Sequence, residues 1–353
     1  MSGPYEIAVF PGDGHGPKVI AAARHVLEAA AIRFDLAFSF TEYPYCGGHY
    51  VETGELLPDK ILHGLPDYHG VFFGGVYHEQ AEAGLLAREI LLKITKTLDQ
   101  YISLRPVRLF PGVKSYLRNK GPQQIDYCIV RENSGGINGG IGGTLMRGTP
   151  METAQETMAY TRYQVERCLR FAFQLASRSD RRKKLTLTGK TSLLPHVQEL
   201  WSRVFEEMGE EFPEVERQYY GVDDICMQLV RYPENFDVIV TGNLFGDILA
   251  DIGAVSQGGI GYAGVGSIHP GQCSMFGPMR ASPDFYEASS DQANPMAAIS
   301  AAAMLLRHLG EHVAAHRLEE AMMVTTATEV IAEGTMLSRF TTKEVAEIVA
   351  ARL

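Results

Sequence analysis

The segment DVIVTGNLFGDILAD, residues 237–251, joins an apolar run to a helical pattern through a single glycine. The apolar run at 238–240 is typical of a buried strand, and the apolar spacing from 245 to 255 is typical of a helix. A buried strand followed directly by a helix is the repeating unit of an α/β fold with a largely parallel sheet. We therefore predict an α/β fold.

The same alternation recurs on both sides of this segment. Short apolar runs predict further strands at residues 5–10, 71–73, 127–130 and 185–187. Helical spacing predicts helices at residues 17–31, 85–98, 159–177, 195–207 and 223–230. The C-terminal third is predicted to be helical, at 297–309, at 312–327 and from Thr341, which has capping-box spacing with Glu344.

Two glycine-rich stretches interrupt the pattern, GGINGGIGG at 135–143 and GGIGYAGVG at 258–266. Their interleaved apolar residues favour close-packed turns or a hairpin arm over a linker. The second stretch contains a G-x-G-x-x-G match, but it follows a helical pattern and no clear helix opens from it. A Rossmann dinucleotide site is therefore not supported.

The composition bounds the domain count and the partners. A chain of 353 residues is long enough for about two domains. Its 32 Lys and Arg residues against 42 Asp and Glu residues give a formal net charge of -10. We expect no nucleic-acid partner and no anionic-membrane surface, because both need a net positive face. No run of about 18 apolar residues is present, so no transmembrane helix is expected.

Cysteine usage and the N-terminus predict a cytoplasmic protein. The chain has 5 cysteines, an odd and widely spaced set without a C-x-x-C pair. This argues against a disulfide framework or a zinc ribbon and fits a reducing compartment. The first residues enter a strand pattern almost at once, without the basic start and apolar run of a secretory signal.

Asp247 and Asp251 stand four residues apart at the start of a predicted helix, so they share one helix face. Open α/β folds bind ligands at the carboxyl edge of the sheet, where this helix begins. A divalent cation with oxygen ligands would offset the repulsion between the two carboxylates. The alternative is a helix start whose acidic residues are stabilised by the helix dipole. The spacing alone leaves both interpretations open.

Asp223 and Lys190 follow strand-like runs in the same way. Asp223, with Asp224, opens a predicted helix and is either a third carboxylate or a helix cap. Lys190 follows the run LTLTG. A lysine at a strand end can act as a general base where neighbouring positive charge lowers its pKa. The alternative is an exposed, solvated lysine.

Arg105 and Arg131 are the candidate anion-binding residues. Arg105 lies in LRPVR at the predicted end of a strand, and Arg131 follows YCIV and precedes a glycine-rich turn. An arginine in such a place can present a bidentate fork to a carboxylate. For either arginine taken singly, the alternative is a surface salt bridge.

Together these segments resemble the isocitrate and isopropylmalate dehydrogenase family of β-decarboxylating 2-hydroxy-acid dehydrogenases. The resemblance covers nearly the whole chain in the expected order. The matching segments are AVFPGDGHGP, LDQYISLRPVRLFPG, IVRENSGG, LTGKTS, VTGNLFGDILADIG and QANPMAAI. Within the family, DQYISLRPVRLFPG and VREN look closest to the tartrate and D-malate dehydrogenase branch.

The resemblance implies two α/β domains around a cleft, in a fold that is not a Rossmann fold. Residues 1–104 and 261–353 would form a discontinuous cofactor-binding domain. Residues 105–260 would form the domain for substrate, metal and dimerisation. The family works as a homodimer in which each active site borrows residues from the partner.

The resemblance also implies a role for each candidate residue. Asp247 and Asp251 would bind Mg²⁺ or Mn²⁺ together with Asp223 of the partner subunit. Arg105 and Arg131 would hold carboxylates of a small anionic substrate. Lys190 of the partner subunit would be the base on the 2-hydroxyl, the metal would polarise that oxygen, and hydride would pass to the nicotinamide.

The implied cofactor is NAD. Asp284 lies in a segment that looks like the family's adenosine loop, where an acidic residue would bind a ribose hydroxyl and repel the 2′-phosphate of NADP. Asn294 would contact the adenine. Arg280 would contact cofactor phosphate, reach the substrate or fill the surface.

Three departures from the family pattern bear on the reaction. The family's proton-donating tyrosine after VREN aligns with Asn138, and an amide is too weak an acid for that step. An arginine ten residues before Arg105 is replaced by Thr95. The cofactor loop reads GPMRA, residues 277–281, in place of the family's EPVHG. We count Asn138 and Thr95 as candidate substrate-binding residues.

The sequence thus predicts a metal- and NAD-dependent dehydrogenase of a malate- or tartrate-like 2-hydroxy acid, with or without decarboxylation. One alternative is a specialised-pathway dehydrogenase on another anionic 2-hydroxy acid, such as an isopropylmalate-like one. The other is a non-catalytic ligand-binding homologue that kept the fold.

Overall fold

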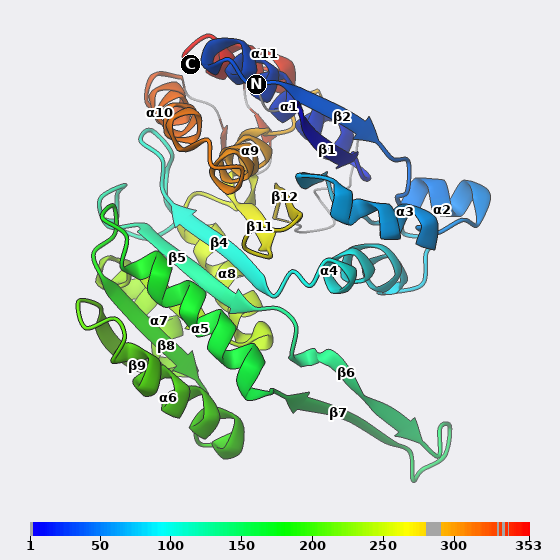
Figure 1. Ribbon diagram of the computed structural model, residues 1–353, viewed down its shortest axis with the longest axis vertical. Helices are drawn as coiled ribbons and strands as arrows, with labels where there is room; N and C mark the ends of the chain where they lie inside the picture. Colours follow the sequence, from blue (N-terminus) through cyan, green and yellow to red (C-terminus); the bar gives the residue numbers. More distant parts are fainter. Residues whose placement is uncertain (1–2, 280–290, 330–331, 334–335, 338) are drawn as a thin grey trace. The chain divides into compact units, whose positions relative to one another are not determined.

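The computed structural model describes residues 3–279, 291–329, 332–333, 336–337 and 339–353 (Figure 1). The chain forms two compact units, and each contains strands and helices in alternation. The first unit is discontinuous and consists of Met1–Gln100, Pro106–Ile125 and Ala254–Leu353. The second unit consists of Tyr101–Arg105 and Asp126–Gly253. Strand β4, Ile102–Arg108, carries the chain from one to the other.

These units differ from the predicted division in three places: residues 106–125 and 254–260 belong with the two chain ends, and residues 101–104 belong with the second unit. The difference has a cause in backbone packing. A Cβ atom on Gly112 would stand 2.0 Å from the carbonyl oxygen of Thr326, so the two backbones are in direct contact. The Ser115 hydroxyl also donates to the Ser256 carbonyl at 2.7 Å. No local sequence pattern signals such contacts.

The first unit is built on strands in the order β2-β1-β3-β12-β11. β1 (Tyr5–Phe10) is parallel to β2 (Phe38–Glu42) and β3 (Gly70–Phe73). β12 (Ser274–Pro278) is parallel to β3 and antiparallel to β11 (Gly264–Ile268). The short strands β13 (Ala332–Glu333) and β14 (Met336–Leu337) form a separate antiparallel pair.

The predicted helices of the first unit are confirmed with small shifts at their ends, whereas α2 and α3 were not predicted from the sequence. The C-terminal helix α11 begins with the predicted capping box, in which the Thr341 side chain accepts from the Glu344 amide. α1 packs against α9 and α11, and α9 packs against β11 and β12. The bounds are α1 Gly16–Phe34, α2 Gly47–Thr53, α3 Asp59–Gly64, a π-helical turn Ala87–Leu92, α4 Lys93–Thr97, α9 Met296–His308, α10 His312–Thr328 and α11 Thr342–Ala350.

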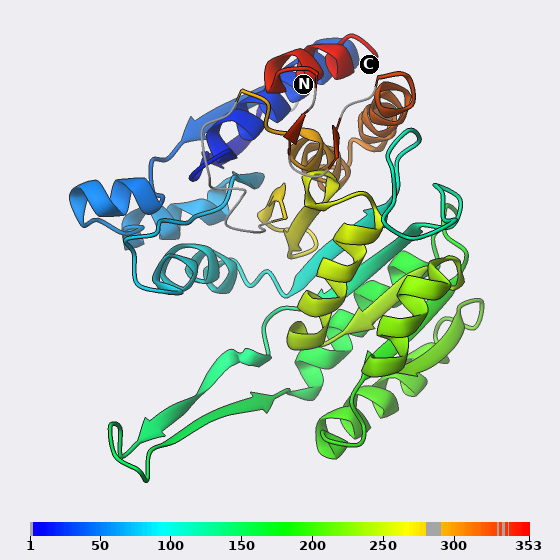
Figure 2. The ribbon, with the colours of Figure 1, turned by 180° about the vertical axis from the view of Figure 1, so that it is seen from behind.

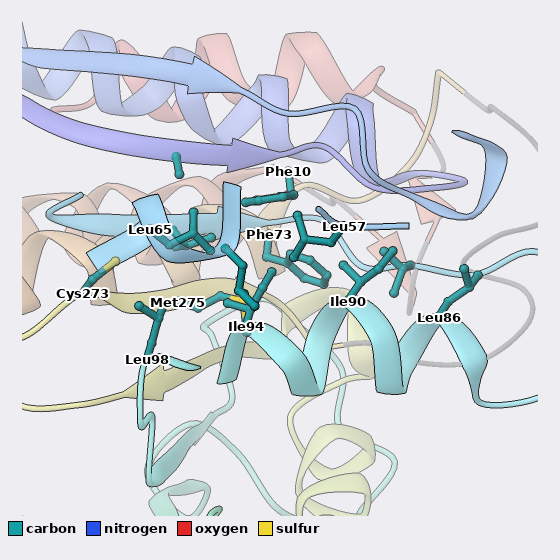
Figure 3. Packing of buried hydrophobic residues seen from close by; sticks show 14 residues of the cluster. Phe10, Leu57, Leu65, Phe73, Leu86, Ile90, Ile94, Leu98, Cys273 and Met275 are labelled. Atoms are coloured by element: carbon teal, nitrogen blue, oxygen red, sulfur yellow. The ribbon is translucent and has the colours of Figure 1, made fainter. Parts of the chain in front are cut away.

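A buried apolar cluster joins β1 and β3 to residues 57–65 and to the helical segment at 86–98 (Figure 3). Phe10 and Phe73 from the strands meet Leu57, Ile90 and Ile94. All five side chains are at most 6% exposed, so this cluster is a close-packed core.

The second unit has four parallel strands in the order β5-β10-β8-β9. They are β5 Asp126–Glu132, β10 Val238–Thr241, β8 Lys184–Gly189 and β9 Glu216–Gly221. α5 (Arg162–Ala176) and α6 (Pro195–Gly209) lie over one face of these strands, and α7 (Val222–Arg231) and α8 (Asn243–Ser256) lie over the other (Figures 1 and 2). The carboxyl ends of parallel strands meet at one edge, where residue 131 lies near the end of β5 and residues 190, 223 and 243 follow the other three strands.

The glycine-rich stretch at 135–143 forms a hairpin arm, as one of its two interpretations predicted. β6 (Gly136–Leu145) and β7 (Thr153–Ala159) pair antiparallel and extend away from the strands of the second unit (Figure 1). Much of the arm is exposed, including Ile141 and Leu145. The other stretch, at 258–266, is instead packed against a helix, because a Cβ atom on Gly264 would lie 3.0 Å from the Ala301 amide nitrogen.

Among the described residues, no helix combines the length and apolar character that crossing a bilayer requires.

The Phe10→Ala substitution should lower the free energy of unfolding by about 3–5 kcal/mol, because it empties a fully buried site that stacks on Tyr43. Urea denaturation followed by circular dichroism measures the change. Ile32→Ala is the control, since Ile32 is 87% exposed and its loss should cost less than about 0.5 kcal/mol. Equal midpoints for the two variants would contradict the packing described for the cluster.

Candidate functional site

Three segments of the second unit bring Arg105, Arg131 and Asp247 together. The Arg131 guanidinium donates to Asp247 Oδ1 at 2.7 Å, and the Arg105 guanidinium donates to the same oxygen at 3.4 Å. Both arginine side chains are largely buried, whereas Asp247 is 53% exposed. The predicted place of Arg105 at a strand end is wrong, because it lies in the middle of β4.

A glycine allows this approach. Gly246 precedes Asp247 on α8, and a Cβ atom there would lie 2.9 Å from the Arg131 side chain. The strand that ends near Arg131 and the helix that carries Asp247 can therefore lie in direct contact.

The pairing of the two arginines with Asp247 leaves a hydrogen-bond donor of Arg131 unused and leaves the group with net positive charge. Two guanidinium groups face one carboxylate, so the group carries an excess of one positive charge. The Nε atom of Arg131 is buried and has no hydrogen-bond partner among the described residues. A buried, unpaired donor is costly unless a ligand meets it. The arrangement therefore suits a small carboxylate, as the sequence analysis predicted for these arginines.

Asp247 and Asp251 lie one turn apart on the same face of α8, and both are exposed. Exposed carboxylate oxygens are ligands that Mg²⁺ and Mn²⁺ prefer. Within the part of the chain that the structure describes, no three His, Cys, Asp or Glu side chains gather closely enough to hold a metal ion. The pair fits two ligands of such an ion, and its metal role stays a prediction.

Lys190 and Asp223 form an ion pair at the edge of the same strands. β8 and β9 are paired with Gly189 opposite Gly221, so the residues that follow them come out side by side. The interpretation of Asp223 as a helix cap is wrong, because Gly221 occupies that position and no side chain caps α7. Lys190 is also not a solvated lysine, since its side chain is 25% exposed and paired.

Asn138 and Thr95 each use their polar group close by in the chain. The Asn138 amide donates to the Asn133 carbonyl at 3.2 Å, which braces the turn that leads into the arm. Thr95 is buried in α4, and its hydroxyl donates to the Leu91 carbonyl in the π-helical turn that leads into α4. Their substrate-binding roles stay predictions.

The predicted cofactor residues are only partly described. Arg280 and Asp284 lie outside the described residues. Asn294 is 3% exposed, and its side-chain oxygen accepts from the Met296 amide at the start of α9.

Comparisons with known proteins agree on one family. The sequence model described as isocitrate/isopropylmalate dehydrogenase matches residues 6–349. The chain is 42% identical to a 3-isopropylmalate dehydrogenase of Thermobifida fusca over 320 residues, which is 90% of each protein. It is 40% identical to a protein of the same name from Leifsonia xyli subsp. xyli over 358 residues, 99% of each.

A solved structure gives the same result. The isocitrate dehydrogenase from Methylococcus capsulatus superposes with a TM-score of 0.86 and is 30% identical over 99% of both chains. A second solved protein, from Thermus thermophilus, superposes with a TM-score of 0.83 at 30% identity, over 99% of this chain and 68% of that one.

One carboxylate beside Arg131 was not among the site residues predicted from the sequence. Glu132 is fully buried and accepts from the Ser134 amide, the Ser134 hydroxyl and the Gly135 amide at 2.5–2.8 Å. Burial raises the pKa of the Glu132 carboxyl, and these hydrogen bonds only partly oppose the shift. An acidic residue between a strand-like run and a Ser-Gly-Gly turn was the available signal.

Because its pKa is raised on folding, Glu132 contributes stability that is fully present below its ordinary pKa of 4.5. That contribution is lost as the pH rises through the pKa of the folded protein. The free energy of unfolding of the wild type, taken relative to Glu132→Gln, should therefore fall as the pH rises above 4.5. Urea titrations of both proteins at a series of pH values measure it, and a difference that does not change with pH would be evidence against the shift.

Proposed function

Because the chain belongs to the isocitrate/isopropylmalate dehydrogenase family, we propose that it is a metal- and NAD-dependent dehydrogenase of an isopropylmalate-like 2-hydroxy acid. The observation that carries this proposal is the grouping of Arg105 and Arg131 around Asp247. The names of the relatives favour an isopropylmalate-like substrate over the malate- or tartrate-like one that the sequence suggested.

The arginines bind and orient the substrate. A substrate carboxylate can take the place of Asp247 as the acceptor, because it offers the same pair of oxygens to the guanidinium forks. It also offers an acceptor to the buried Nε of Arg131. Substrate binding thus releases the oxygens of Asp247 for another partner.

Asp247 and Asp251 would hold Mg²⁺ or Mn²⁺, with Asp223 of the partner subunit as a further ligand. When bound, the metal polarises the oxygen of the 2-hydroxyl group. Lys190 of the partner subunit would take the hydroxyl proton. Its pairing with Asp223 fixes where the amine stands at the strand edge.

Asn138 supplies no proton for a decarboxylation step, because an amide is not an acid near neutral pH. Its side chain is instead held by the turn at Asn133. The residues described here therefore support oxidation of the alcohol, and release of CO₂ is a separate measurement.

We propose NAD rather than NADP as the cofactor. Asp284 would repel the additional phosphate of NADP and bind a ribose hydroxyl of NAD, and Asn294 would contact the adenine. Arg280 is proposed to contact cofactor phosphate.

A homodimer with shared sites is the proposed assembly, in the cytoplasm and without nucleic-acid or membrane partners. α7 and α8 lie over the same face of the second unit and expose Met227, Val230 and Ile248, each at least 50% exposed. Large apolar side chains on neighbouring helices are typical of a subunit interface. The arm also exposes large apolar side chains, among them Ile141 and Leu145.

A substrate panel tests the proposed activity. With NAD and Mn²⁺, an isopropylmalate-like acid should give more NADH than malate, tartrate or isocitrate, and CO₂ is assayed in parallel.

Asp247→Asn should lower kcat at least about 100-fold, because it removes a charged metal ligand. Turnover that is unchanged in Asp247→Asn would remove the metal from the mechanism. If calorimetry detects no binding of NAD or NADP to the wild-type protein, the interpretation as a non-catalytic ligand-binding homologue would be favoured.

Mixed dimers test the shared site. Lys190→Ala and Asp247→Asn homodimers should both be inactive. A heterodimer of the two chains keeps one site in which both residues are intact, so it should recover about half of the wild-type activity per dimer. An inactive heterodimer would show that Lys190 and Asp247 serve the same site within one chain.

A further inference from the structure

The root of the β6–β7 arm is fastened to the first turn of α8 by the side chain of Asn243. Asn243 is 0% exposed. Its amide nitrogen donates to the Gly135 carbonyl, and its side-chain oxygen accepts from the Ile137 amide at 3.3 Å. The same oxygen accepts from the Leu244 amide at 3.0 Å, so it also satisfies a free amide of the helix start.

Tyr160, which follows β7, closes the other root of the arm onto the same helix end. The Asn243 main-chain amide donates to the Tyr160 hydroxyl at 3.3 Å. Two glycines make the contact possible. A Cβ atom on Gly136 would lie 2.3 Å from the Tyr160 hydroxyl and 2.5 Å from the Asn243 side chain, and one on Gly242 would lie 2.4 Å from the same hydroxyl.

This clamp and the arginine site form one closed ring. The chain runs from Arg131 to Gly135, and Gly135 is held on its amide side by Glu132 and on its carbonyl side by Asn243. One helical turn connects Asn243 to Asp247, and Asp247 pairs back to Arg131. The end of β5 and the start of α8 are thus joined at two points, one turn apart on the same helix face.

We propose that Asn243 is a positioning residue that keeps α8 in register with the Arg131 turn when Asp247 leaves Arg131. This rests on the proposed function, in which substrate replaces Asp247 on the arginines and Asp247 turns to the metal. Of the two joints, only the one at Asn243 then remains. Asn243 therefore sets where Asp247 and Asp251 stand for the metal, and it connects the arm to that position.

Two variants separate this role from simple capping of the helix start. Asn243→Ala removes every side-chain contact. Asn243→Asp keeps an acceptor for the Leu244 and Ile137 amides but has no donor for the Gly135 carbonyl. Thr241→Val is the matched control. Thr241 ends β10, two residues before Asn243, and the substitution removes one buried hydrogen bond, from the Thr241 hydroxyl to the Thr188 carbonyl.

The readouts are Mn²⁺ affinity by calorimetry and amide hydrogen exchange at residues 134–160 of the full-length protein. Asn243→Ala should bind Mn²⁺ about 10- to 100-fold more weakly, the loss seen when a residue that orients metal ligands is removed. Both Asn243 variants should exchange faster at the arm root. Thr241→Val should match the wild type in both measurements.

If the amides at the arm root exchange at the wild-type rate in Asn243→Asp, the proposal is overturned, because capping of the helix start alone would then account for the role of Asn243. Wild-type Mn²⁺ affinity in a folded Asn243→Ala protein would also overturn it. Absence of Mn²⁺ binding by the wild type would instead count against the proposed function, while the exchange comparison still decides whether Asn243 holds the arm root.

Discussion

The contact between Arg131 and Asp247 is the constraint on which the candidate site depends. It joins the end of a buried strand to the helix that follows the neighbouring strand, and Arg105 adds a second positive charge to the same carboxylate oxygen. A lone carboxylate at this place would be satisfied by water. Two arginines in largely buried positions need an anion, and Asp247 provides one.

Parallel strand order explains why distant residues share this edge. β5, β10, β8 and β9 all end on the same side, so the residues that follow them approach one another although they lie up to about a hundred positions apart. Glycines complete the arrangement where backbones must touch, with Gly246 beneath Arg131 and Gly136 beneath Tyr160. The fold therefore brings together side chains that no short motif contains.

Much of this was accessible from sequence periodicity. The α/β alternation, the helix carrying Asp247 and Asp251, and the capping box at Thr341 and Glu344 all follow from local spacing. Local spacing failed where a partner is distant. It left Asp223 open between a third carboxylate and a helix cap and did not reveal its pairing with Lys190. It also passed over Glu132 and Asn243, whose partners are backbone groups of a turn and an arm. Backbone partners leave no pattern in side-chain identity.

The discontinuity of the first unit has a consequence for synthesis on the ribosome. β3 needs β12 as its neighbour, with Gly70 opposite Ser274, so the opening hundred residues emerge long before the strand that completes them. The second unit is nearly contiguous in the chain and can fold during that interval. Until the C-terminal part is translated, the nascent polypeptide carries an unpaired β3 edge, which is a surface that chaperones recognise and that other unfinished chains can join.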